Sequence, residues 1–241
     1  MQFSLCIPTM KRWKFLQENL PKYLANPYFA EIIIVDETGE DYEILKSVYV
    51  NEPRIKVFCN EKRLGPFHNK LECMKRAQCE WILLMDSDNF ADMNYFESLF
   101  KYFDKTNTKR VYMPSKAMPD FDYSFFSGMT LTPKFMGSLL REKKDKYLTT
   151  CFNTGNYLLS KTAVDTILRY REDGLSNYCF CYDVLYSNIL LLKNGFDFFV
   201  VPDMTYRHVV HEGSVYFELK EHATQAYTYL IELFNQVCLE A

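Results

Sequence analysis

The chain has 241 residues, enough to bury one substantial hydrophobic core, so a single domain over residues 1–241 is expected. Hydrophobic residues make up 48% and charged residues 24% of the sequence, which is the balance of an ordinary folded protein. The formal net charge of −3 argues against nucleic acid as the main partner.

The N-terminal segment lacks the basic stretch and long apolar run of a secretory signal peptide. No apolar run approaches the roughly 18 residues that a membrane-spanning helix needs. The eight cysteines include one close pair, Cys179 and Cys181, with no second pair at the spacing of a zinc site. We therefore expect reduced thiols in a cytoplasmic protein with neither a signal peptide nor a transmembrane segment.

The first hundred residues alternate between short apolar runs and segments with helical spacing. The run at 32–35 is entirely β-branched, which is typical of a strand covered on both faces. Pro21 is expected to bend or interrupt the first helix. Strands separated by helices in this way predict a parallel sheet with helices on both faces. The predicted strands cover 3–7, 32–35, 55–58 and 81–85, and the predicted helices cover 13–24, 42–50 and 67–79.

Polar or turn-forming residues follow each of these four strands at the point where the strand ends. Because the carboxyl ends of parallel strands meet at one edge of a sheet, these residues should line one crevice, where ligands usually bind. They are Pro8 and Thr9 after the first strand, Asp36 and Glu37 after the second, Asn60 after the third, and Asp86, Ser87 and Asp88 after the fourth.

The second half of the chain is less regular. Segment 118–126 combines aromatic and acidic residues, and it is either an edge strand or a loop whose rings offer a stacking surface to a ligand. The last helix is amphipathic but not basic, so it is expected to pack on the protein rather than lie on a membrane. The predicted strands cover 111–113, 156–159 and 196–201, and the predicted helices cover 132–144, 161–171, 183–193 and 215–239.

Asp86 and Asp88 lie two residues apart just past a buried strand, a placement that packing does not easily explain. Carboxylate oxygens suit Mg²⁺ or Mn²⁺, which prefer a few carboxylates together with substrate phosphates. Such a cation neutralises the charge that develops on a diphosphate leaving group. The alternative is a polar turn, because Asp, Ser and Asn all favour turns.

Taken in order, these motifs resemble those of glycosyltransferases of the GT-A fold, family 2 type. The resemblance covers residues 3–90 well and continues more thinly through 153–156 and 182–196. It implies an α/β fold of the GT-A type, with a mostly parallel central sheet, helices on both faces and a smaller antiparallel acceptor-side region. Residues 1–110 would form the nucleotide-sugar-binding half and residues 111–241 the acceptor-binding half. The motifs are Cys6-Ile7-Pro8-Thr9, Ile32 to Glu37, Asn60 with Gly65, and Ile82 to Asp88.

The resemblance also implies an activity: an inverting, metal-dependent transferase with Mn²⁺ or Mg²⁺ as cofactor. It would move a sugar from a nucleotide-diphosphate sugar, with UDP favoured, to a hydroxyl of a glycan, glycoprotein or glycolipid acceptor. A sugar-1-phosphate nucleotidylyltransferase is one alternative, but the glycine-rich loop that it needs after the first strand is absent from residues 9–13. The second alternative is a non-catalytic protein that binds sugar nucleotides. An activity assay distinguishes such a protein from a transferase.

Site residues can be carried over from the family position by position. If the segment around His208 and His211 is a strand, the two side chains point to opposite faces and only one reaches the site. Asp36 could instead cap the helix before Tyr42, and Asp86 to Asp88 could form a turn. Arg12, Arg63 and Asn69 could instead be solvated surface residues. The nucleotide-sugar candidates are Pro8, Thr9, Arg12, Asp36, Glu37, Asn60, Arg63, Asn69, Asp86 and Ser87; the metal candidates are Asp86, Asp88 and His211; further candidates are His208, Gly155 and Asn156.

The resemblance places the catalytic base at the start of a helix. Inverting members of the family often carry an acidic motif there, followed about a dozen residues later by Gly and an aromatic residue. Asp183 and the later pair Gly195-Phe196 fit this pattern, but Tyr182 occupies the first acidic position, which leaves Asp183 as the candidate. A carboxylate within reach of the acceptor hydroxyl can accept its proton. Alternatively, Asp183 caps the helix and complements its dipole.

Overall fold

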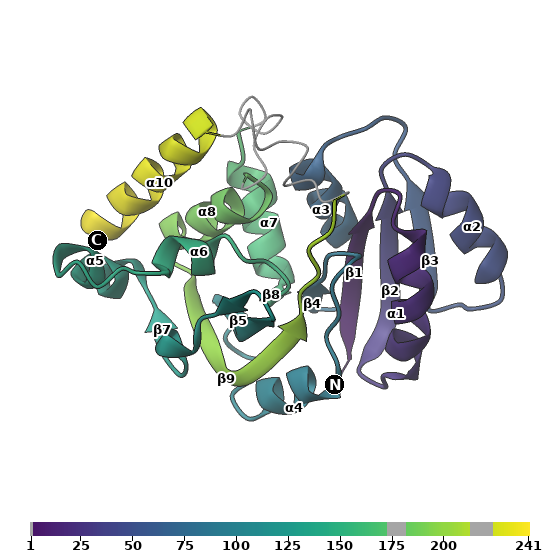
Figure 1. The fold of residues 1–241 in the computed structure, drawn as a ribbon, viewed down its shortest axis with the longest axis horizontal. Helices are drawn as coiled ribbons and strands as arrows, with labels where there is room; N and C mark the ends of the chain where they lie inside the picture. Colours follow the sequence, from purple (N-terminus) through teal and green to yellow (C-terminus); the bar gives the residue numbers. More distant parts are fainter. Residues whose placement is uncertain (1, 173–181, 213–223) are drawn as a thin grey trace.

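In the computed structural model, which describes residues 2–172, 182–212 and 224–241, both halves of the chain contribute strands to one mixed sheet (Figure 1). The strands are β1 (Phe3–Thr9), β2 (Phe29–Asp36), β3 (Ile55–Cys59), β4 (Trp81–Leu84), β5 (Arg110–Met118), β6 (Phe121–Asp122), β7 (Thr130–Leu131), β8 (Leu158–Ser160) and β9 (Asp197–Arg207). Their order is β3-β2-β1-β4-β8-β5-β9-β7, with β6 paired to β5.

The parallel and antiparallel pairings divide this sheet into two regions. Strands β3, β2, β1 and β4 run parallel to one another, and β5 and β9 form a second parallel pair. Between them β8 is antiparallel to both of its neighbours, and β6 and β7 add further antiparallel pairings. The predicted α/β fold, with a mostly parallel sheet and a smaller antiparallel region, is confirmed.

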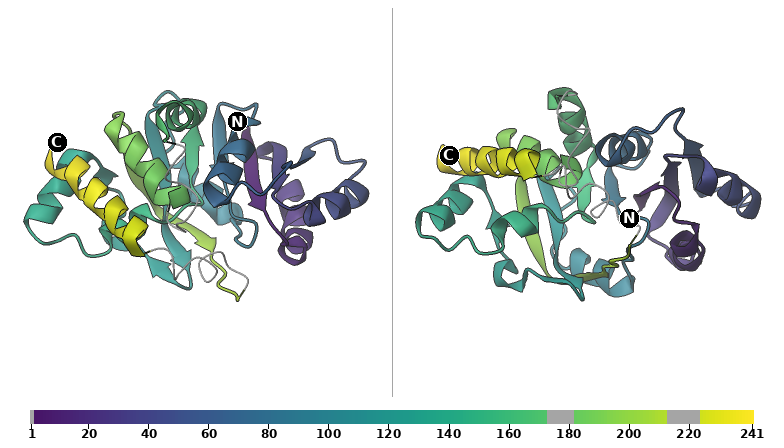
Figure 2. Two further views of the ribbon diagram at one scale, coloured as in Figure 1. Left: turned by 90° about the horizontal axis from the view of Figure 1, so that it is seen from above. Right: turned by 45° about the horizontal axis from the view of Figure 1, so that its top comes forward.

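Helices cover both faces of the sheet because successive side chains of a strand point to opposite sides. Along β1, Leu5 belongs to one hydrophobic cluster and Cys6 to the other. The first face is covered by α1 (Trp13–Ala25), α2 (Glu40–Val48) and α4 (Met93–Phe100). The second is covered by α3 (Pro66–Lys75), η1 (Ser124–Phe126), α5 (Pro133–Arg141), α6 (Leu148–Phe152), α7 (Lys161–Tyr170), η2 (Tyr182–Tyr186), α8 (Ser187–Lys193) and α10 (Thr224–Leu239) (Figures 1 and 2).

Several elements differ from their predicted extents. Helix α1 is not interrupted at Pro21, because its inner face is anchored by buried side chains on both sides of the proline, Leu20 and Tyr23 among them. Strand β5 continues through Pro114, where the register shifts, and a bulge of this kind tolerates the missing proline N–H. Segment 118–126 forms the edge strand β6 and the short helix η1. Residues 215–223 of the predicted last helix lie outside the described residues.

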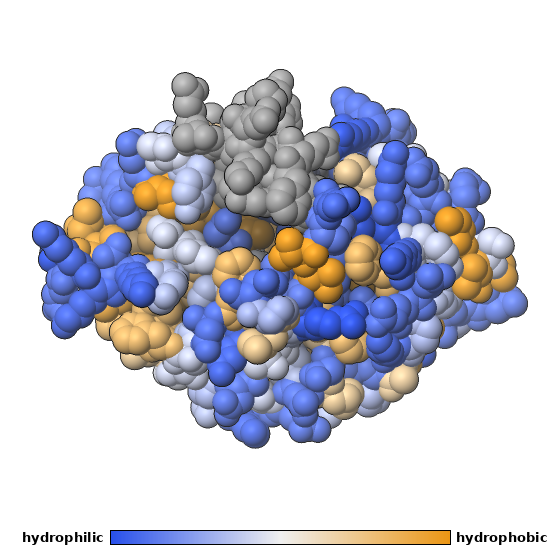
Figure 3. Space-filling model, in the orientation of Figure 1, coloured by the Kyte–Doolittle hydropathy of each residue, from blue (hydrophilic) through white to orange (hydrophobic). Residues whose placement is uncertain are grey.

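The surface seen in Figure 3 is mostly hydrophilic, with separate hydrophobic patches, one of them near the middle of the view and one over α2. Ile44, Val48 and Val50 are exposed there. Within residues 2–172, 182–212 and 224–241, no helix combines the length and apolar character needed to cross a bilayer.

Helix α10 packs closely on α5 at the end of the molecule remote from β3 (Figure 2). The approach is possible because Gly137 of α5 has no side chain. A Cβ at this position would lie 2.1 Å from the backbone oxygen of Cys238 in α10. Gly137 therefore sets the distance between the two helices.

Replacing Gly137 with alanine is expected to destabilise the protein, because the added methyl group would collide with α10. In an open helix the same change stabilises by up to about 1 kcal/mol, so the sign of the effect reports the contact. We expect a loss of about 1–3 kcal/mol in the free energy of unfolding, measured by chemical denaturation. Lys134→Ala, exposed on the same helix, serves as the control. A Gly137→Ala protein as stable as the wild type would contradict this packing.

Candidate active site

A cavity of about 330 Å³ opens where the parallel strands β1, β2 and β4 end. Residues from the second half of the chain form its opposite wall, so the cavity lies between the two parts of the sheet. Most of the residues proposed from the sequence line it. These are Pro8, Thr9, Arg12, Glu37, Asn69, Asp86, Ser87, Asp88, Gly155, Asn156, Asp183 and His208.

Four of the proposed residues, Asp36, Asn60, Arg63 and His211, are not part of this lining. The fully buried carboxylate of Asp36 accepts hydrogen bonds from the backbone N–H of Thr38 (3.1 Å) and of Tyr42 (2.9 Å). That arrangement matches the alternative in which Asp36 orders the start of α2. Its neighbour Glu37 reaches the cavity instead.

Asn60 reaches the site through a second amide. Its Nδ2 donates to Oδ1 of Asn69 (2.8 Å), and Nδ2 of Asn69 in turn donates to the backbone oxygen of Val35 (3.3 Å). Asn69 is buried and lines the cavity, so it is not the solvated surface residue of the alternative interpretation.

The loop between β1 and α1 is held by a carboxylate that the sequence analysis did not single out. Asp41 of α2, which is buried, accepts hydrogen bonds from the backbone N–H groups of Arg12 (2.8 Å) and Trp13 (2.9 Å) and from the hydroxyl of Thr9 (2.6 Å). Helix α1 has no side-chain cap at its own N-cap residue, so Asp41 supplies one from another helix. This interaction fixes the loop that carries Thr9 and Arg12 to the cavity.

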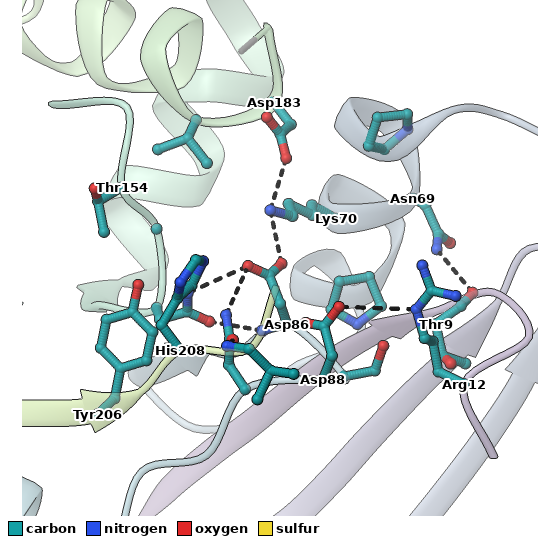
Figure 4. Close-up of a pocket in the computed structure, with 18 of the residues that line it drawn as sticks. Thr9, Arg12, Asn69, Lys70, Asp86, Asp88, Thr154, Asp183, Tyr206 and His208 are labelled. Atoms are coloured by element: carbon teal, nitrogen blue, oxygen red, sulfur yellow. Dashed lines mark hydrogen bonds and ion pairs between the residues drawn. The ribbon is translucent and has the colours of Figure 1, made fainter. Parts of the chain in front are cut away.

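The centre of the cavity is an ammonium group between two carboxylates. Nζ of Lys70, on α3, lies 2.8 Å from Oδ1 of Asp86 and 2.7 Å from Oδ2 of Asp183 (Figure 4). Burial disfavours the charged ammonium, but the two carboxylates outweigh burial and raise the pKa of Lys70 above its usual value. Burial raises the pKa of Asp183, and the charge of Lys70 only partly offsets it. Lys70 is therefore charged, and Asp183 is a weaker acid than an exposed aspartate.

Asn156, from the second half of the chain, also holds Asp86 in place. Asn156 Nδ2 donates to Oδ2 of Asp86 (3.2 Å), and the Asp86 backbone N–H donates to Oδ1 of Asn156 (2.7 Å). Burial opposes ionisation of Asp86, but Lys70 and Asn156 stabilise its anion, so its pKa lies below the usual value. Asn156 also has a φ of 62°, a left-handed conformation that asparagine tolerates better than most residues.

Asp88 contacts two basic side chains, neither of which is Lys70. Its Oδ2 lies 3.0 Å from Nε2 of His211 and 3.8 Å from Nε of Arg12. The ring of His211 packs against Phe15, with centroids 5.0 Å apart, which orients the imidazole. Burial and the nearby charge of Asp86 raise the pKa of Asp88.

Both candidate histidines lie close to the site. His208 lines the cavity, and its Nδ1 lies 2.6 Å from Oδ2 of Asp120, while His211 contacts Asp88. Strand β9 ends at Arg207, so the alternation of side chains along a strand does not apply to either residue. The condition for placing only one of them at the site, a strand that runs through both residues, is therefore not met; His208 lines the cavity, and His211 is outside that lining.

The comparison with known families decides the assignment. The family model described as "Glycosyl transferase family 2" matches residues 4–168, more than half of the chain. The chain belongs to this family. No curated protein matches the sequence. The resemblance seen in the strand-end motifs, the GT-A fold and the predicted class of enzyme, glycosyltransferase, are thereby confirmed.

Solved structures similar to this glycosyltransferase include residues 1–349 of S. aureus TarS. The complex with UDP has a TM-score of 0.69 and 18% identity, and the complex with UDP-GlcNAc has a TM-score of 0.71 and 18% identity. The match covers 100% of this chain in both cases, but 66% and 67% of those chains. At this level of identity the likeness shows the shared fold.

The transferase has an excess of negative charge in its cavity. Apart from the imidazole of His208, its described lining contains four carboxylates and two basic side chains, which leaves a net charge of about −2 when these six are ionised and the imidazole is neutral. The carboxylates are Glu37, Asp86, Asp88 and Asp183, and the basic side chains are Arg12 and Lys70. A diphosphate entering this cavity would be repelled unless a cation accompanied it.

Few of the described side chains could serve as ligands of a cation. Across the described residues, no group of three or more His, Cys, Asp or Glu side chains could hold a metal ion. Asp88 Oδ2 and His211 Nε2 lie 3.0 Å apart, close to the roughly 3 Å between adjacent ligands of an octahedral ion bound at about 2.1 Å. The protein thus offers two suitable donors, and substrate oxygens or water would supply the others.

Lys70 is the most important residue that the sequence analysis missed. A signal for it was present: Lys70 follows Phe67 by three residues and precedes Met74 by four, so it shares the buried face of α3. A lysine at a core-facing helical position needs a buried partner. The sequence did not show which carboxylates would provide it.

Replacing Lys70 with methionine should destabilise the protein by about 3 kcal/mol near pH 8, because two carboxylates would lose their buried counter-charge. The loss should shrink as the pH falls, since protonation of Asp183 removes one unpaired charge. Thermal unfolding at pH 8 and pH 5.5 measures both effects. Lys75→Met is the matched control, because Lys75 lies on the same helix with its side chain 59% exposed. Equal losses for the two variants would contradict the central role of the Lys70 ion pairs.

Proposed function

We propose that this family 2 glycosyltransferase moves a sugar, with inversion, from a nucleotide-diphosphate sugar to an acceptor hydroxyl. The observation that carries the proposal is that Lys70 bridges Asp86 and Asp183, whereas Asp88, two residues after Asp86, contacts His211. The Asp88–His211 pair suits a cation that binds the diphosphate, and the Lys70–Asp183 pair suits a base beside the acceptor. UDP and UDP-GlcNAc bind to the TarS structures that share this fold, which favours a UDP-sugar as donor.

The proposed donor site uses the loops that follow the first strands. Thr9, Arg12 and Asn69 lie together on one side of Asp86 (Figure 4), and Pro8, Glu37 and Ser87 line the same cavity. In this proposal residues 1–110 bind the nucleotide and residues 111–241 provide the acceptor side. Asp36, Asn60 and Arg63 stay predictions as nucleotide contacts, and Asn60 would act through Asn69.

Asp88 and His211 would hold the proposed Mg²⁺ or Mn²⁺. When bound, the cation neutralises charge on the leaving diphosphate by Lewis acidity. Asp86 was predicted as a third ligand, but its two carboxylate oxygens already contact Lys70 and Asn156. Asp86 therefore fits better as a fixed carboxylate that faces the donor and orients Lys70.

Asp183 is the proposed general base. Its carboxylate lines the cavity, is 11% exposed and is oriented by Lys70. It would accept the proton of the acceptor hydroxyl as the acceptor oxygen bonds to the anomeric carbon. The bond from that carbon to the diphosphate oxygen breaks in the same step, and the nucleoside diphosphate leaves. A base with a raised pKa accepts this proton more readily than an exposed aspartate does.

The two alternative functions have less support. A nucleotidylyltransferase needs a phosphate-binding loop rich in glycine after β1, and residues 9–13 contain none. A non-catalytic nucleotide-sugar-binding protein would have no use for a buried carboxylate held by a lysine opposite the donor loops. The experiments below distinguish these alternatives from the transferase.

UDP is expected to bind to the wild-type protein only when Mg²⁺ or Mn²⁺ is present, because the cavity lining is negatively charged. Asp88→Asn and His211→Ala should each weaken binding at least about tenfold in the presence of the metal. Calorimetric titration with UDP, with and without EDTA, measures both effects. Asp165→Asn, an exposed carboxylate on α7, is the control. Equal affinity in EDTA would remove the cation from the proposal.

Asp183→Asn should retain UDP binding but lose sugar transfer by roughly 10²-fold or more, because the amide cannot accept the proton. In the wild type, transfer should decline as the pH falls through the pKa of Asp183. Because burial raises that pKa, the acidic limb should lie above the value near 4 of an exposed aspartate. Release of UDP from a UDP-sugar, followed across pH, gives both quantities. Unchanged turnover in Asp183→Asn would exclude Asp183 as the base.

A further inference from the structure

The cavity has two ends with different chemistry. In Figure 4, Thr9, Arg12 and Asn69 lie on one side of Asp86, whereas Thr154 and Tyr206 lie on the other. The proposed donor site occupies the first end. The second end adjoins Asp183 through Val184.

The second end carries no permanent charge among its described lining residues. Its polar atoms are hydroxyls, amides and an imidazole, and the two basic residues of the cavity, Arg12 and Lys70, are paired with carboxylates elsewhere. Two acids adjoin this end, Asp183 in the lining and Asp120 outside it, which contacts His208, and both add negative charge. A phosphate or carboxylate would find no free cation among these residues, so the lining favours an uncharged ligand.

Phe121 gives this end a rigid aromatic surface. The planes of its ring and the Tyr123 ring form an angle of 8°, and the two ring centroids lie 6.0 Å apart. The centroids of the Phe121 and His208 rings lie 5.3 Å apart. Tyr123 is itself buried and hydrogen bonded to Thr154, so the ring behind Phe121 cannot move away. The C–H face of a pyranose ring packs well on an aromatic face of this kind.

An unsatisfied hydrogen-bond acceptor lies in the same wall. Oδ1 of Asn153 is buried and has no hydrogen-bond partner among the described residues. Asn153 lines the cavity next to Thr154. A buried acceptor without a partner costs free energy. This oxygen has almost no accessible surface, so the amide must turn toward the cavity before a ligand hydroxyl can donate to it, and that hydrogen bond would remove the cost.

We propose that this end of the cavity is the acceptor subsite and that it binds an uncharged sugar ring, with Phe121 as the platform and Asn153 as a hydrogen-bond acceptor. The inference rests on the proposed function, because the sugar is placed beside Asp183. It narrows the acceptor to a neutral glycan end and disfavours a phosphorylated or carboxylated group at this position.

Saturation-transfer NMR tests the subsite directly. The probes are methyl glycosides of neutral hexoses and N-acetylhexosamines, with methyl glucuronide and glucose 6-phosphate as charged counterparts, each with UDP and Mg²⁺ present. At least one neutral glycoside should receive saturation on its ring C–H protons, and the charged probes should not. Phe121→Ala and Phe121→Leu should weaken that binding about tenfold. Phe125→Ala, in the same segment but 64% exposed, should leave it unchanged.

Asn153→Ala separates binding from stability. If the unpaired oxygen serves a ligand, this variant should bind the neutral glycoside about tenfold more weakly and melt no lower than the wild type, because no described contact of that oxygen is lost. A fall in melting temperature with unchanged glycoside binding would overturn the role of Asn153.

The outcomes separate this inference from the proposed function. If UDP binds but no neutral glycoside shows binding that depends on Phe121, the subsite alone is overturned. A preference of the protein for the charged probes would overturn the subsite in the same way. Glycoside binding that depends on Phe121 without any UDP binding would keep the sugar site and overturn the proposed donor.

Discussion

The arrangement of the cavity depends on one buried ammonium group that two carboxylates share. Lys70 comes from α3, Asp86 follows β4, and Asp183 belongs to η2, so three elements meet at a single nitrogen atom. Removing water from an unpaired charge costs several kcal/mol, and each of the three groups therefore requires the others. Because η2 belongs to the second half of the chain and α3 to the first, these ion pairs also join the two walls of the cavity.

The same ion pairs determine how positive charge is distributed in the proposed reaction. The charge of Lys70 is already shared between Asp86 and Asp183, so little of it remains for a diphosphate. Four carboxylates against two basic side chains leave the cavity negative, and an exchangeable cation at Asp88 and His211 would correct this. A fixed ammonium that orients the base and a separate cation for the leaving group would then act independently. The proposed acceptor end needs neither of them, which agrees with its uncharged lining.

The parallel half of the fold was predictable because its strands are short apolar runs separated by helical periods. The rule that ligands bind at the carboxyl ends of such strands correctly brought Thr9 and Asp88 to one cavity. It could not distinguish Asp36 from Glu37, which are adjacent and both acidic. Backbone N–H groups decide the difference: those of Thr38 and Tyr42 hold Asp36 inward, and those of Leu64 and Gly65 hold the carboxylate of Glu37. The sequence could not show whether the two histidines belong to a strand, since the end of β9 is set by its pairing with β5.

Partners far away in the sequence decide which polar residues complete the site. Asp86 is fixed by Asn156, 70 residues later, and Asp88 contacts His211, 123 residues later. A short acidic motif after a strand is consistent with either a turn or a ligand site, because the motif does not contain these partners. The second half of the chain therefore does more than provide the proposed acceptor side. By supplying Asn156, Asp183 and His211, it turns the acidic end of β4 into a site with defined positions for charge.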